Sequence, residues 1–182
     1  TGALTMGFWQ NKNGQSIITK YCGGTSGTSL YAFLTGYNPF KGLTATSCTG
    51  IASYVLNVIK AANASGTSMN PMLKAQMLAS ALDVYFSSPS LGGNRIGAPA
   101  PVGAVSVDLL TVCADIGSGC SVLEDTSAAF GGMSSMTVLQ LLAHAAGQSN
   151  AGGTIWYGNV KSIQELAKDT FDAINNEKVF AP

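Results

Sequence analysis

Charged residues are scarce in this 182-residue chain, making up 10% of it, against about 25% in an average soluble domain. Nine Lys and Arg residues balance nine Asp and Glu residues, so the formal net charge at pH 7 is zero. A neutral chain lacks the basic surface that attracts nucleic acid or an anionic membrane, so we expect neither partner. Near-zero net charge also removes the repulsion that keeps copies of a protein apart, which favours association.

The chain also has few of the residues that catalysis uses. It contains one histidine, His144, and neither a G-x-S-x-G motif nor a phosphate-binding G-K-[ST] sequence. On a helix, His144 would lie beside Gln140 and Gln148 and away from the apolar stripe, which predicts a surface side chain. The acidic residues are scattered rather than paired as in a glycosidase. We therefore expect no enzyme activity and no cofactor.

The four cysteines contain no C-x-x-C pair, and one histidine adds little to a zinc site. Two disulfides are favoured instead, with sequence-adjacent pairing (Cys22 with Cys48, Cys113 with Cys120) preferred among the three possible connectivities. Disulfides persist in oxidising compartments, so this interpretation predicts a secreted protein.

Two further sites are weaker hypotheses. Asp115, Glu124 and Asp125 could together supply oxygen ligands to calcium, although their spacing matches no known calcium loop and we predict no metal site. Asn63 begins an Asn-Ala-Ser sequon and is a candidate for glycosylation in a suitable host. No apolar run approaches the roughly 20 residues of a membrane span.

Apolar residues are plentiful, at 46%, and their spacing is mostly helical. The sequence predicts a mainly α, single-domain bundle spanning 1–182, with about five helices around a buried central helix at 71–86. The other helical segments are one before Cys22 that Asn13 could cap, then 30–34, 51–62, 136–146 and 160–174. Residues 105–109 alternate like a strand, and Cys113 and Cys120 are expected to close a small β-hairpin.

Polar residues on the two main helices lead to two further predictions. The central helix is apolar around most of its circumference, with a narrow polar strip made by Gln76, Ser80, Asp83 and Ser87. On the last helix, Lys161, Glu165, Lys168 and Asp172 are predicted to face solvent and to form two Lys–acid pairs at i, i+4.

Three stretches of the sequence resemble one known family. The segment 7–15, GFWQNKNGQ, is similar to the G-[FY]-W-x-N-[KH]-N-G-Q opening of an uncharacterised domain in large secreted bacterial surface proteins. Residues 74–85 resemble that domain's central helix, and the Tyr-Gly-Asn at 157–159 fits its spacing before the last helix. The resemblance implies an extracellular structural role and no catalytic residues.

The opening motif also has a physical interpretation. Trp9 is expected to be a buried anchor, while Asn11, Asn13 and Gln15 bind nearby backbone and cap the helix. This would be a role in folding rather than in ligand binding.

We accordingly expect a non-catalytic extracellular structural protein that associates with copies of itself in a filament or surface layer. An extended N-terminal lead, residues 1–6, is expected to dock on a neighbouring copy. One alternative is a monomeric adhesion or carbohydrate-binding module that stacks glycans on exposed aromatic side chains. The candidates for that platform are Trp9, Tyr37, Phe40, Trp156 and Tyr157. A second alternative is a secreted carboxylate-dependent hydrolase.

Overall fold

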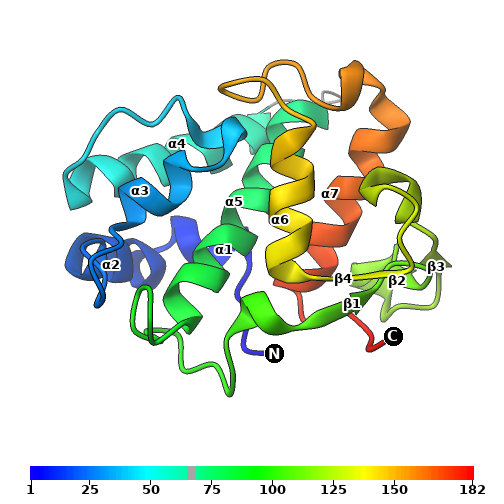
Figure 1. The fold of residues 1–182 in the computed structure, drawn as a ribbon, viewed down its shortest axis with the longest axis horizontal. Helices are drawn as coiled ribbons and strands as arrows, with labels where there is room; N and C mark the ends of the chain where they lie inside the picture. The colour runs from blue at the N-terminus through cyan, green and yellow to red at the C-terminus, as the bar shows by residue number, and fades with distance from the viewer. Residues whose placement is uncertain (65–68) are drawn as a thin grey trace.

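The computed structural model describes residues 1–64 and 69–182. Its central element is α5 (Met69–Ser87), which runs through the middle of the molecule between α4 (Cys48–Ala64) and α7 (Lys161–Asn175) (Figure 1). Every residue from Ala75 to Ser87 is buried, because neighbouring elements cover the helix on all sides. The predicted mainly helical bundle around a buried central helix is confirmed, and α5 extends beyond the predicted range at both ends.

Three helices precede α4 in the first part of the chain. They are α1 (Met6–Gln10), α2 (Lys12–Tyr21) and α3 (Leu30–Thr35), followed by a 3-10 turn at Asn38–Phe40. The Thr5 hydroxyl caps α1 by accepting a hydrogen bond from the Phe8 amide, at 3.2 Å. The predicted cap at Asn13 is wrong, because α2 begins at Lys12, two residues before the start that such a cap would give, with Asn11 at its N-cap position.

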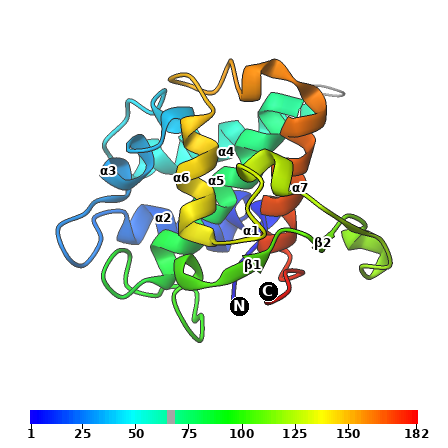
Figure 2. The ribbon, with the colours of Figure 1, turned by 45° about the vertical axis from the view of Figure 1, so that its right-hand side comes forward.

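The strands lie in the second half of the chain. β1 (Ser106–Asp108) pairs antiparallel with β4 (Ser135–Thr137), and β2 (Val112–Cys113) pairs antiparallel with β3 (Leu123–Glu124). The β2–β3 hairpin and its connecting turn project from the body of the molecule (Figure 2). The predicted strand at 105–109 corresponds to β1.

The helix predicted at 136–146 begins later than expected. Residues 135–137 form β4, and α6 (Val138–Gly147) starts after them. A capping box sets this boundary: the Thr137 hydroxyl accepts from the Gln140 amide, and the Gln140 side chain accepts from the Thr137 amide. Thr137 therefore ends a strand and starts a helix at once.

Both disulfides have the preferred pairing. Cys22–Cys48 joins the end of α2 to the start of α4, and Cys113–Cys120 closes the β2–β3 hairpin. In the described part of the chain, no helix combines the length and the apolar character needed to cross a membrane.

The polar strip of α5 is fully inside the molecule and is paired at each position. The side-chain amide of Asn175 donates to the backbone carbonyl and to the side-chain oxygen of Gln76. The Ser80 hydroxyl donates to the side-chain oxygen of Asn175, and all three distances are 2.8–2.9 Å. The Ser87 hydroxyl accepts from the Val102 amide at 2.9 Å. Because each of the four residues binds a distant segment, although Asp83 Oδ2 itself has no hydrogen-bond partner, this strip fixes how α7 and the 102–104 turn sit on α5.

The extended N-terminal lead docks on its own chain, which corrects the expectation that it would dock on a neighbour. Ala3 is buried, and the Leu4 amide donates to Asp83 Oδ1 of α5 at 3.0 Å. A lead held in this way is part of the fold. It is therefore not available as a free arm for assembly.

The charged face of α7 also differs from the prediction. Lys168 forms its ion pair with Asp169, the next residue, and both are partly buried. Asp172 is also partly buried, and its side chain accepts from Asn176 at 2.8 Å. Neither predicted i, i+4 pair occurs among the described residues.

Candidate functional site

Trp9 connects two of the stretches that the sequence analysis singled out. Its side chain is fully buried, its ring stacks on Phe86 at 5.6 Å, and its indole N–H donates to Asp83 Oδ1 at 3.0 Å. Burial raises the pKa of Asp83 well above its usual value, and the nearby Glu177 carboxylate adds to this shift. The opening motif and the central helix are thus joined by one buried hydrogen-bonded contact.

The rest of the opening motif forms a tight corner between α1 and α2. The Gln15 amide donates to the Trp9 carbonyl at 2.9 Å, as expected of a side chain that binds backbone. A Cβ at Gly14 would lie 2.3 Å from the Phe8 carbonyl oxygen, so only glycine permits this approach. Asn11 makes no capping hydrogen bond through its side chain, and Asn13 is exposed on α2.

The aromatic platform proposed for sugar binding does not form. Trp9, Phe40 and Trp156 are fully buried, and Tyr157 is 9% exposed with its hydroxyl donating to the Ala129 carbonyl. Tyr37 is partly buried and packs edge-on against Phe33. These side chains belong to the core and give no flat exposed surface for a glycan ring.

His144 is half-buried on α6 rather than freely exposed. Its ring packs against Phe130, with 5.8 Å between ring centroids. Within the described residues it takes part in no hydrogen bond or ion pair. The sequence predicts a surface side chain for His144, and the structure places this side chain in a more enclosed position.

The three acids considered for calcium do not converge. The Asp115 carboxylate accepts from the Ser121 amide and hydroxyl and from the Val122 amide, which fixes it inside the β2–β3 connection. Asp125 accepts from the Ser127 amide at 2.9 Å. Within the described residues, no group of three or more His, Cys, Asp or Glu side chains is arranged to hold a metal.

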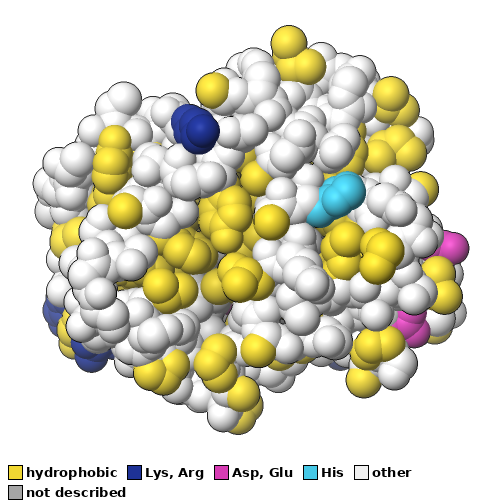
Figure 3. All heavy atoms as spheres, in the orientation of Figure 1, with side chains coloured by type: hydrophobic (Ala, Val, Ile, Leu, Met, Phe, Trp, Pro, Cys, Tyr) yellow, Lys and Arg dark blue, Asp and Glu magenta, His cyan; other side chains and the backbone are white. Residues whose placement is uncertain are grey.

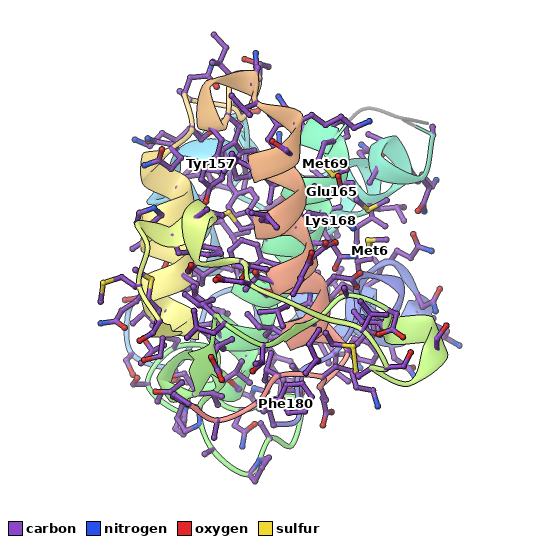
Figure 4. The ribbon with its side chains drawn as sticks, turned by 90° about the vertical axis from the view of Figure 1, so that its right-hand side faces the viewer. Met6, Met69, Tyr157, Glu165, Lys168 and Phe180 are labelled. Atoms are coloured by element: carbon purple, nitrogen blue, oxygen red, sulfur yellow. A yellow bond between two sulfur atoms is a disulfide. The ribbon has the colours of Figure 1, made fainter. Side chains whose placement is uncertain are left out.

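Glu124 instead faces α7, where it meets Asp169. One Glu124 carboxyl oxygen is buried without a hydrogen-bond partner. Burial, together with the neighbouring Asp169 carboxylate, raises the pKa of Glu124 to about 8. Figure 4 views this end of the molecule directly, with Glu165 and Lys168 following one another along α7. The two carboxyl groups share a partly buried site, but neither lines the cavities of about 490 or 540 Å³.

The raised pKa of Glu124 predicts that this carboxyl group stabilises the fold more in mild acid than above pH 8. The folded state holds this proton more tightly than the unfolded chain, whose carboxyl has its usual pKa of 4.5. The contribution of Glu124 to stability is therefore fully present below that value and is lost as the pH rises through about 8. The pKa of Asp83 is also raised, so its contribution to stability changes with pH in the same direction.

Thermal unfolding followed by circular dichroism between about pH 5 and pH 8.5 measures this effect. We expect the melting temperature to fall across the range, and Glu124→Gln to flatten the decline. Asp125→Asn is the matched control, because Asp125 is an exposed neighbour whose pKa is lowered by hydrogen bonds to Ser127. An equal decline in wild type and Glu124→Gln would contradict the assignment.

Asn63, the glycosylation candidate, is exposed in the last turn of α4. The serine that completes its sequon, Ser65, lies outside the described residues. The position of Asn63 is compatible with attachment of a glycan, which stays a prediction.

Comparison with protein-family models, curated proteins and solved structures finds no match to this chain. The functional assignment therefore depends on the chain's own chemistry.

The charges of this neutral protein are separated along the sequence and in space. Residues 1–95 contain six of the nine Lys and Arg residues but one acid, Asp83, whereas residues 96–182 contain three basic residues and eight acids. Asp83 is fully buried. The first part thus has a formal net charge of +5 and the second a formal net charge of −5, with every acid counted as ionised.

The two parts pack against each other in the middle of the molecule, where α5 meets α7, but each reaches one end of the long axis. α2 lies at one end and the β2–β3 hairpin at the other, in both ribbon views (Figures 1 and 2). On the face shown in Figure 3, acidic side chains are visible at the right-hand edge, near β3, and basic ones lie mainly on the left. The molecule is therefore electrically polar, although it is neutral overall.

Each end also presents apolar or aromatic surface. At the acidic end, Leu110, Val122 and Leu123 are 47–55% exposed on and beside the β2–β3 hairpin. At the basic end, the Arg95 guanidinium stacks on the exposed ring of Tyr21, 3.9 Å from its centroid. Exposed apolar side chains at an acidic end and a Tyr–Arg stack at a basic end are typical of interface surfaces.

The total charge of the sequence conceals this arrangement, because the positive and negative charges cancel. Counting charges in each half of the chain would have revealed the imbalance. Their placement at opposite ends of the long axis depends on the fold, so the sequence pattern alone could not supply it.

Proposed function

We propose that the protein is a non-catalytic extracellular structural domain that associates head to tail with copies of itself in a filament or surface layer. The observation that carries the proposal is the separation of opposite charge to the two ends of a neutral molecule. The acidic end of one copy attracts the basic end of the next, while like ends repel. Contacts between unlike surfaces that do not close into a ring generate an open chain of subunits.

Short-range contacts would add to this attraction. Leu110, Val122 and Leu123 offer apolar surface that a neighbouring copy can cover. Tyr21 and Arg95 at the other end are residue types that often contribute most of an interface's binding energy. Charge thus sets the orientation of the subunits, and burial of these side chains stabilises the contact.

An extracellular location is supported by the two disulfides, which form and persist in oxidising compartments. The Cys113–Cys120 disulfide also closes the projecting hairpin at the acidic end, so fewer conformations are open to this segment. A binding surface that is ordered before contact loses less conformational freedom on association.

Charge reversal at each end tests the proposal. Lys12→Glu with Lys20→Glu reverses two exposed charges on α2, and Asp125→Lys with Glu165→Lys reverses two exposed acids at the other end. We expect either pair to weaken association roughly tenfold or more in light scattering at low salt. A chain with all four changes again has opposite charges at its two ends, now with the polarity reversed. Association should therefore return in this variant.

A matched control separates the effect of position from that of net charge. Lys161→Glu with Lys178→Glu changes the net charge by the same amount as the α2 pair, but makes the acidic end more acidic. Association should persist in this variant. If it is lost as fully as in the α2 variant, net charge rather than polarity governs assembly and the proposal is wrong.

A further inference from the structure

A cavity of about 490 Å³ lies between α4, α5 and the loop at 152–154. Its volume is within the range of sites that hold small organic molecules. Much of its wall is apolar or small, including Val58, Ala61 and Pro71, with Asn57 and Asn70 as its amide groups. The self-association proposed above makes no use of this region.

Lys74 is the charged side chain among the described residues that line this cavity. It is partly buried, its ammonium donates to the Gly152 carbonyl at 3.1 Å, and it lies 5.8 Å from the centroid of the Tyr54 ring. Burial lowers the pKa of Lys74, because removal from water disfavours the charged form. No acidic residue of the described chain forms an ion pair with it.

An ammonium group has three N–H donors, and one carbonyl uses a single one of them. A partly desolvated cation without a counter-charge gains from an anionic partner more than an exposed lysine would. The hydroxyl of Tyr54, on the same wall, is also buried without a hydrogen-bond partner. Folding therefore leaves the Tyr54 hydroxyl without a hydrogen bond and the Lys74 ammonium with a single one at the same cavity.

The amides of the wall have different roles. The Asn70 side chain donates to the Thr154 carbonyl at 2.9 Å and accepts from Gln164, so it holds the loop in place. Asn57 is exposed at the cavity. A single cation among apolar walls suits a singly charged anion with an apolar body, whereas a phosphate dianion usually requires several donors.

We propose that this cavity binds a small organic carboxylate, with the carboxylate on Lys74 and an apolar body against Val58, Ala61 and Pro71. The Tyr54 ring forms the floor beneath the ammonium. The larger cavity of about 540 Å³ beside Leu139 and Pro101 has no charged residue among its lining side chains and would not select an anion.

Titration with benzoate, followed by NMR or calorimetry, tests the proposal. Benzyl alcohol presents the same ring without the charge, and acetate presents the charge without the ring. We expect benzoate to bind roughly tenfold or more tightly than either control. Equal binding of benzoate and benzyl alcohol, or no benzoate binding up to tens of millimolar, would overturn it.

Two variants locate the binding to this cavity. Lys74→Met keeps a long side chain but removes the charge, and should weaken benzoate binding roughly tenfold. Lys60→Met is the matched control, because Lys60 is an exposed lysine of α4 that does not line the cavity, and its benzoate affinity should be unchanged. Ala61→Phe fills the cavity while keeping Lys74, and should also abolish binding. Retained affinity in both Lys74→Met and Ala61→Phe would place the ligand elsewhere.

Discussion

Replacement of Trp9 with alanine is expected to lower the free energy of unfolding by about 3–5 kcal/mol, the largest effect of any single substitution considered. The side chain is fully buried, packs on Phe86 and donates to Asp83. Its removal leaves a large cavity and takes one of two donors from a buried carboxyl group. Because small domains are stable by only about 5–15 kcal/mol, much of the total would be lost.

Urea denaturation measures this loss, and two variants separate its causes. Trp9→Phe keeps an aromatic ring but removes the N–H, and should cost about 1–3 kcal/mol because the buried Asp83 Oδ1 loses one of its two donors and keeps only the Leu4 amide. Combining Trp9→Phe with Asp83→Leu removes both partners, so the double variant should lose less than the sum of the single changes. Phe8→Ala, at the partly buried neighbouring position, is the control and should cost less than Trp9→Ala. A Trp9→Ala variant within about 1 kcal/mol of wild type would contradict the anchoring role.

The second large effect is expected from the Cys22–Cys48 disulfide. This bond spans 26 residues and ties α2 to α4, so replacing both cysteines with alanine should cost roughly 3–4 kcal/mol through added freedom of the unfolded chain. The Cys113–Cys120 bond spans 7 residues, and on the same basis its removal should cost roughly 2–3 kcal/mol. Urea midpoints of the two double variants give the comparison. A larger loss for the shorter loop would show that strain or packing, rather than loop entropy, dominates.

The helices could be predicted because their signals are local. The apolar spacing of α4 and α7 and the turn residues around α5 are visible within a few turns of sequence. The sequence predicts the start of α6 two residues early, because Met136 fits the helical stripe although it pairs with Val107 in a strand. A strand partner 29 positions away leaves no local trace in the sequence.

The partners of the polar strip of α5 are likewise not visible in the local sequence. Its four polar residues were recognised, but their partners come from Leu4, Trp9, Val102 and Asn175, far away in the chain. The same holds for Glu124, which was considered as a calcium ligand with its sequence neighbours and instead meets Asp169 across the fold. Local patterns identify which residues are unusual, while tertiary packing decides what they contact.

Sedimentation equilibrium of the unmodified protein across ionic strength tests the central claim, that opposite ends of neighbouring copies attract. Between about 20 mM and 500 mM salt, the screening distance falls from roughly 20 Å to less than 5 Å. The account predicts concentration-dependent oligomers of increasing length at low salt and a shift to monomer as salt rises. A protein that stays monomeric at every ionic strength and high concentration, or that associates more strongly as salt increases, would contradict it.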